Sequence, residues 1–127
     1  GSISTLSNIS IDGVGDKALS AGEISKISGR YIEILNAEIG ITSKDLSEVN
    51  LSEVEIRDSR LGFAIFQKKE EYGAAKAIVE GLEMTNVDFD HLVGFDSTLT
   101  LNGKNVINKR SEISDLLYGA TFGKSSL

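Results

Sequence analysis

NAEIGITSKDLSEV, residues 36–49, decides the fold of this chain because its pattern recurs on both sides of it. The shift that moves Asn36 onto Asp58 aligns this stretch with DSRLGFAIF at 58–66, and the same shift toward the N-terminus aligns it with VGDKALSAGEISKI at 14–27. Each copy contains short runs of apolar residues, as expected for short strands, and lacks the spacing of apolar residues that a long helix would show. Repetition at a fixed period of this kind is typical of architectures in which stacked units share one core.

The repeat continues toward the C-terminus with one interruption. The tripeptide IEI at 32–34 matches VEI at 54–56 at the same shift, and VEI in turn matches LEM at 82–84 at a longer one. The longer second spacing coincides with the polar segment QKKEEYGAA at 67–75. We therefore predict that successive units stack in register and that this segment is an excursion from the stack.

This pattern predicts an all-β fold, namely a right-handed parallel β-helix, a single-stranded solenoid of about four coils stacked at roughly 4.8 Å. The 13 glycines and the absence of proline suit short strands with frequent turns. A leucine-rich repeat has a similar period but requires the pattern LxxLxLxxN, which is missing, and a β-sandwich remains an alternative. The predicted single domain is 3–127, with coils at about 3–27, 28–49, 50–79 and 80–101, a C-terminal cap at 102–127, and residues 1–2 as a tag remnant.

Residues 110–119 have the pattern of a short amphipathic helix that would cap the last coil. Ser111 is a suitable N-cap, Gly119 is a suitable stop, and one face carries Ile113, Leu116 and Leu117. The N-terminus shows no matching cap and no initiator methionine. We therefore expect a fragment whose open first coil continues into an upstream domain of a parent protein, or forms a homo-oligomer.

The composition argues against several kinds of partner and site. With 13 Lys and Arg against 19 Asp and Glu, the formal net charge is -6, which opposes binding to nucleic acid and to anionic membranes. Cysteine is absent and His91 is the single histidine, so we predict no metal site and no cofactor. No serine lies in a nucleophile-elbow motif, and the glycines form no phosphate-binding loop. We therefore assign no catalytic residue.

Stacking would turn equivalent positions into columns, and one column is acidic. Glu33, Glu55 and Glu83 occupy the same outward position in successive units. Carboxylates at this spacing repel one another unless a cation or a basic side chain intervenes. The column is either a cation-binding or acid/base strip, as in pectate-lyase-like β-helices, or a solvated face balanced by bases such as Arg57.

A second candidate surface surrounds the excursion at 67–75. Loops on rigid scaffolds carry binding residues disproportionately often. Outward side chains of the preceding coil would lie on the same side as the excursion, where they could contact an acidic sugar or a protein. The alternative is a tolerated insertion with a solvated run of charges. The candidate binding residues are Lys44, Asp45, Gln67, Lys68, Lys69 and Tyr72.

Two motifs resemble a known kind of module. GIxSKDxSxV begins at Gly40 and QKKxEYG begins at Gln67, and LLYGATFGKSS at 116–126 is similar to the ends of the same proteins. This combination, over roughly 14–127, resembles parallel β-helix modules near the C-terminus of bacterial surface or secreted proteins with CotH-like kinase or lamin-tail-like domains. The resemblance implies an appended β-helix and carries over no kinase activity, because no residue here matches a nucleotide site.

The sequence therefore predicts a non-catalytic β-helix module of a larger extracellular or cell-surface protein. Such a module would act as a scaffold, an oligomerisation element, or a contact element for a polysaccharide or a protein. One alternative is a polysaccharide-active, lyase-like β-helix enzyme or its remnant. Another is a trimeric fibre or adhesin stem module.

Overall fold

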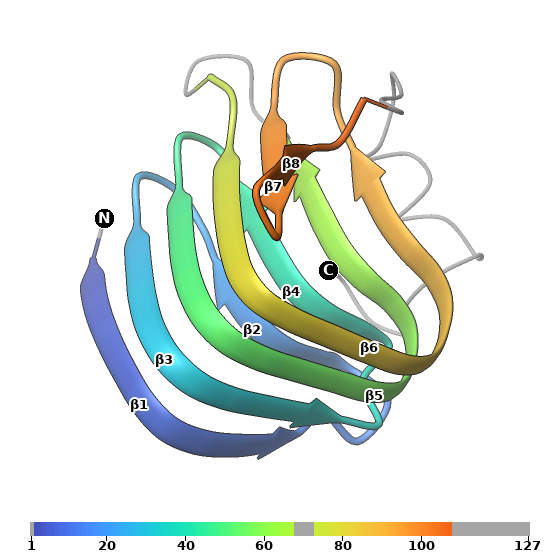
Figure 1. The fold of residues 1–127 in the computed structure, drawn as a ribbon. Coiled ribbons are helices and arrows are strands. Elements are labelled where there is room, and N and C mark those ends of the chain that lie inside the picture. The colour runs from blue at the N-terminus through green and yellow to red at the C-terminus, as the bar shows by residue number, and fades with distance from the viewer. Residues whose placement is uncertain (1, 68–72, 108–127) are drawn as a thin grey trace.

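A computed structural model describes residues 2–67 and 73–107, which form one mostly parallel sheet of eight strands (Figure 1). The described residues contain no helix. The strands are β1 (Ile3–Asp12), β2 (Lys17–Ala21), β3 (Lys26–Leu35), β4 (Ile39–Lys44), β5 (Glu48–Phe66), β6 (Lys76–Val93), β7 (Thr98–Leu101) and β8 (Lys104–Asn105). The prediction of an all-β fold is therefore confirmed.

The sheet pairs strands that are one repeat apart, so consecutive repeats lie side by side. Its main path runs β1-β3-β5-β6-β7-β8, while β2 pairs with β4 and β4 with β5. Val54 is paired with Ile32, its equivalent in the preceding repeat, and with Leu82, its equivalent in the following one. Both the shorter and the longer shift in the sequence pattern are thus hydrogen-bonding registers of the sheet.

The strands bend sharply at corners where one residue adopts the left-handed conformation. One corner holds Asn36, Asp58 and Asn86, with φ of 54°, 52° and 55°. Asn and Asp tolerate positive φ better than other non-glycine residues, because their short polar side chains bond to nearby backbone. The bends fold the sheet around its own inner face (Figure 1). As a result, β2 and β4 share a core with β3 and with the first half of β5.

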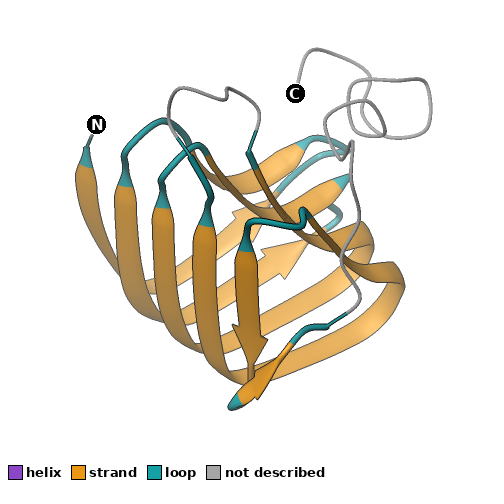
Figure 2. Ribbon diagram, turned by 90° about the horizontal axis from the view of Figure 1, so that it is seen from above, coloured by secondary structure: helices purple, strands orange, loops and turns teal. Residues whose placement is uncertain are grey.

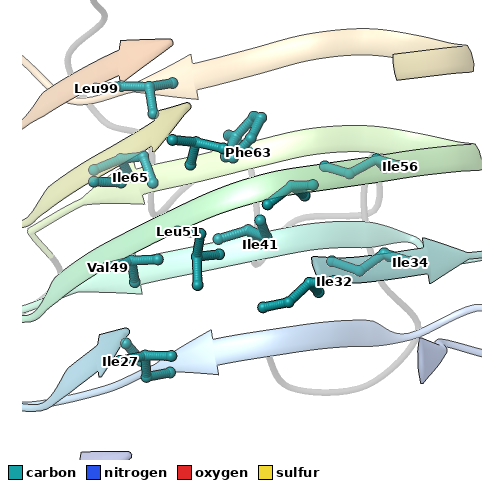
Figure 3. Close-up of a cluster of buried hydrophobic side chains, with 14 of the residues drawn as sticks. Ile27, Ile32, Ile34, Ile41, Val49, Leu51, Ile56, Phe63, Ile65 and Leu99 are labelled. Carbon is teal, nitrogen blue, oxygen red and sulfur yellow. The ribbon is translucent and has the colours of Figure 1, made fainter. Parts of the chain in front are cut away.

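Apolar columns fill the space inside the bent sheet (Figure 3). Ile34 pairs with Ile56, and Ile41 with Phe63, and all four side chains are fully buried. Each such side chain contributes about 1.5–3 kcal/mol by leaving water. Ile39 lies in a second buried cluster with Leu61, Ala64, Phe66 and Leu92. Ile39 and Ile41 are therefore both buried but belong to different clusters.

The described C-terminal end is closed by a hairpin that runs against the parallel direction of the sheet. β8 pairs antiparallel with β7 through Asn102 and Gly103, whose φ values are 51° and 81°. An Asn-Gly pair with positive φ at both residues is the preferred two-residue hairpin turn. Figure 2 shows this hairpin beside the stacked strands. The predicted capping helix at 110–119 lies outside the described residues.

Candidate functional site

The acidic column lies on the outer surface of β3, β5 and β6. Glu33 pairs with Glu55, and Glu55 pairs with Glu83, as the repeat predicts. Arg57 holds the first two carboxylates, with Nη2 2.8 Å from Oε2 of Glu33 and Nε 3.7 Å from Oε1 of Glu55. Ser10 donates a further hydrogen bond of 2.8 Å to Oε1 of Glu33. The column is thus tied together by neighbouring side chains along part of its length.

Beside this column the outer surface is hollowed where the strands turn a corner. The hollow has a volume of about 370 Å³ and opens broadly to solvent. Its polar lining consists of carboxylates and one aromatic side chain: Tyr31, Glu33, Glu53, Glu55 and Glu83. We call this depression the acidic hollow.

Glu53 and Gly81 shape the floor of the acidic hollow. Both have positive φ, 56° and 61°, and they occupy the same corner of β5 and β6. A Cβ atom on Gly81 would lie 2.9 Å from Oε1 of Glu53, so the carboxylate of Glu53 rests over the glycine backbone. Any larger residue at Gly81 would displace this carboxylate and would also be strained.

Tyr31 forms one wall of the hollow from the preceding strand. Its φ is 61° and its side chain is half exposed. The guanidinium of Arg30 lies 4.9 Å from the centre of its ring, which is within the range of a cation–π contact. An exposed aromatic ring beside hydrogen-bond acceptors offers both a stacking surface and polar contacts to a ligand.

The described residues contain no group of three or more carboxylate or imidazole side chains placed to hold a metal ion. This includes the acidic column, whose first two members face Arg57. The carboxylates that line the hollow accept hydrogen bonds and attract positive charge, and the hydroxyl of Tyr31 can donate or accept a hydrogen bond. Arg57 lies against two of the three carboxylates of the column, as the interpretation of a solvated face with neighbouring basic side chains expects.

The structure separates the candidate residues around the excursion. Lys44 pairs with Phe66, so it lies next to Gln67, where the excursion begins. Lys68, Lys69 and Tyr72 lie outside the described residues. Asp45 was predicted to point outward with Lys44, but it is buried, with 1% of its surface exposed. The turn between β4 and β5 gives Asp45 a φ of 53°, and this breaks the alternation on which the prediction relied.

Asp45 belongs to a buried polar corner that the sequence pattern did not predict. The hydroxyls of Ser43 and Ser47 lie 2.7 Å apart, and Ser43 donates to the carbonyl of Lys76 at 3.1 Å. Both serines are fully buried. Buried polar groups that pair with one another and with the backbone stabilise a turn. This corner is therefore a structural network, and Asp45 is withdrawn from the surface that a ligand could reach.

His91 pairs with Phe63 in the register of β5 and β6. Its Nδ1 atom is buried and makes no hydrogen bond. No serine or carboxylate is hydrogen-bonded to it among the described residues, so the chain as described does not place it in a catalytic arrangement.

Sequence reasoning missed Tyr31, Glu53 and Gly81 as parts of a site. They lie at the corner next to the acidic column. The three residues occupy the same position in successive repeats, but the residue type differs in each repeat. The available signal was this change of residue type at equivalent positions of the repeat.

In the part of the chain that the structure describes, no helix is long and apolar enough to cross a membrane. Comparison of the chain with protein-family models, with curated proteins and with solved structures found no match.

Proposed function

We propose that the chain is a right-handed parallel β-helix that serves as a non-catalytic scaffold and contact module of a larger secreted or cell-surface protein. The parallel registers, the corners that recur in each repeat and the stacked apolar columns support the β-helix. The resemblance of the motifs at Gly40 and Gln67 to such modules supports the larger parent protein.

One observation carries the scaffold role: outer polar side chains pair with the equivalent positions of the next repeat. Asn86 donates to Asp58 at 2.8 Å across β6 and β5, and Arg60 pairs with Glu38 at 3.2 Å. Together with Arg57 and Glu33, these contacts form ladders along the stacking direction. Exposed pairs contribute little stability each, about 0–1 kcal/mol, but they fix the register between neighbouring repeats.

The main alternative, a polysaccharide-active enzyme, requires the acidic column to act on substrate. The discriminating experiment measures turnover of a panel of anionic and neutral polysaccharides by the wild-type chain and by a Glu33→Gln, Glu55→Gln double variant. The scaffold proposal expects the same background level for both proteins, because it assigns these two carboxylates to contacts with Arg57 and not to a reaction. Glu38→Gln is the matched control, since it removes a paired carboxylate outside the hollow.

Turnover by the wild-type chain that falls about tenfold or more in the double variant, but not in Glu38→Gln, would replace the scaffold proposal with the enzyme. Retention of a polysaccharide without turnover is compatible with a contact module. Loss of that retention in the double variant would assign the contact to the acidic hollow.

A further inference from the structure

The second halves of β5 and β6 bury side chains on both faces of the sheet. Ile65 and Val93 belong to the inner core, whereas their neighbours Phe66 and Leu92 belong to the second buried cluster. Successive side chains of a strand point to opposite faces of a sheet. The second cluster therefore lies on the outer face, where β4, β5 and β6 run side by side.

This part of the outer face is covered, although the outer face of the sheet is open elsewhere. Ala64 is fully buried, Phe66 is 2% exposed, and Thr42, which pairs with Ala64, is 3% exposed. By contrast, the paired outer residues Asn50 and Ile78, in the first halves of β5 and β6, are both exposed. The described strands all belong to one sheet around the inner core, and the described turns join them end to end, so neither lies across this face (Figure 2). The cover must come from residues of this chain outside the described ranges.

Gly1 aside, the residues outside the described ranges form two segments that differ in their suitability as a cover. Residues 68–72, KKEEY, are charged at every position except the last. Charged side chains packed against an apolar face would lose their hydration without gaining partners. Residues 108–127 instead contain Ile113, Leu116 and Leu117, whose spacing places them on one side of a helix. The second segment therefore matches the apolar face.

The preceding hairpin directs the chain toward this face. β8 runs back along β7, and the amide of Val106 donates to the carbonyl of Leu99 at 2.9 Å. Because a short turn joins β6 to β7, the described chain returns toward the ends of β5 and β6, where the outer cluster lies (Figure 1). A helix of about ten residues is roughly 15 Å long, and strands lie about 4.8 Å apart. The helix that the sequence predicts at 110–119 is therefore long enough to cross β4, β5 and β6.

We propose that residues 108–127 fold back onto the outer face of β4, β5 and β6, with Ile113, Leu116 and Leu117 packed against the second buried cluster. The segment then covers the side of the sheet, and not the end of the inner core where the sequence pattern alone put it. This docking surface concerns the fold of the chain itself. It is independent of whether the module is a scaffold or an enzyme, so its test and the polysaccharide experiment can fail separately.

The chain has no cysteine, so one introduced thiol reports on one position. Leu92→Cys places a thiol in the outer cluster, and Val93→Cys places one in the inner core beside it. Both thiols are expected to react slowly with iodoacetamide, followed by mass spectrometry, whereas Ile78→Cys reacts fast because this side chain is exposed. Adding Leu116→Asp with Leu117→Asp should raise the rate at Leu92→Cys about tenfold or more, because two charges oppose packing on an apolar face. The rate at Val93→Cys should not change.

Rapid alkylation of Leu92→Cys in the otherwise unchanged chain overturns the proposal, since the outer face would then be open. A rate at Leu92→Cys that the double aspartate substitution leaves unchanged overturns it as well. Faster alkylation of Leu92→Cys caused by Tyr72→Asp, and not by the double substitution, would assign the face to 68–72 instead.

If the double aspartate substitution also exposes Val93→Cys, it has opened the inner core, and a second measurement that leaves the segment apolar decides. Leu92→Cys is then combined with a second cysteine in place of Ile113, Leu116 or Leu117, and the chain is oxidised. At least one of the three pairs is expected to form a disulfide within the chain, which requires Cα atoms within about 7 Å of each other. Ile78→Cys with the same three partners should form none. Failure of all three pairs with Leu92→Cys overturns the proposal.

Discussion

At the scale of the residue, the corners of this fold show whether a residue type suits the backbone conformation that it adopts. Asn36, Asp58 and Asn86 suit the left-handed conformation that they adopt, and Asn86 also donates to Asp58. Ile24 and Val14 adopt the same conformation without this compatibility, with φ of 49° and 47°. Both are largely exposed, so little burial offsets the strain in the isolated chain. The first repeat therefore retains avoidable strain.

Replacing Ile24 by asparagine is expected to stabilise the chain by about 1 kcal/mol, because an L-residue with a bulky side chain loses roughly this amount in the left-handed conformation. The measurement is the free energy of unfolding in urea, taken at a concentration where the chain is monomeric. Ile78→Asn makes the same chemical change in an extended strand and is expected to destabilise, because isoleucine is the better strand former. Destabilisation by Ile24→Asn would mean that the contacts of the half-exposed isoleucine side chain stabilise the chain by more than the left-handed conformation costs.

Single residues also show which side-chain positions the repeat pattern predicted and which it did not. The repeat period predicted that Glu33 and Glu55 stack, because strand positions alternate regularly between the two faces. The same rule failed at Asp45, where left-handed residues interrupt the alternation and turn a predicted surface carboxylate inward. The acidic hollow escaped prediction for a related reason, since Tyr31 and Glu53 sit at corners whose geometry no periodicity encodes.

At the scale of the element, β4, β5 and β6 approach one another closely through glycines. A Cβ atom on Gly62 would lie 2.6 Å from the carbonyl oxygen of Asp90 and 2.8 Å from the sulfur of Met84. Gly40 faces the carbonyl of Gly62 in the same way, at 2.8 Å. The glycine that recurs in the repeat is therefore required by the distance between strands, whereas neither position has a positive φ.

Gly62→Ala is expected to destabilise the chain by about 1–3 kcal/mol, because the backbone of β6 must shift to admit the methyl group. Gly22→Ala is the control, since a Cβ atom there meets no other atom within 4 Å. This control should change the free energy of unfolding by less than about 0.5 kcal/mol. Thermal and urea unfolding of both variants check the difference. Equal changes in the free energy of unfolding for the two variants would show that the distance between β5 and β6 leaves room for a methyl group at Gly62.

The length of the elements could not be predicted as well as their register. The sequence pattern suggested several short strands, but β5 is one continuous strand from Glu48 to Phe66 that includes Glu53 and Asp58. A left-handed residue turns the chain without interrupting the ladder on either side of it, because both neighbours remain extended. Register follows from matched residue types, whereas strand ends depend on these single dihedral angles.

At the scale of the whole molecule, the repeats are not equally supported. Side chains of β5 are paired and covered from both directions, and Ile56 and Leu61 are fully buried. Among the described residues β1 has one neighbouring strand, and its apolar side chains are exposed or only partly buried. In a stack of repeats, stability is close to a sum of each repeat and its contacts with the two adjacent ones. The first repeat should therefore open at a lower free energy than the centre.

Native-state hydrogen exchange tests this gradient. In dilute solution, amides of β1 are expected to exchange at least about a hundredfold faster than those of β5, because opening one edge strand requires far less free energy than global unfolding. Uniform exchange in all strands would contradict the gradient and imply that the chain opens only as one cooperative unit. Slow exchange in β1 together with slow exchange in β5 would instead imply that the first repeat is as strongly supported as the centre of the stack.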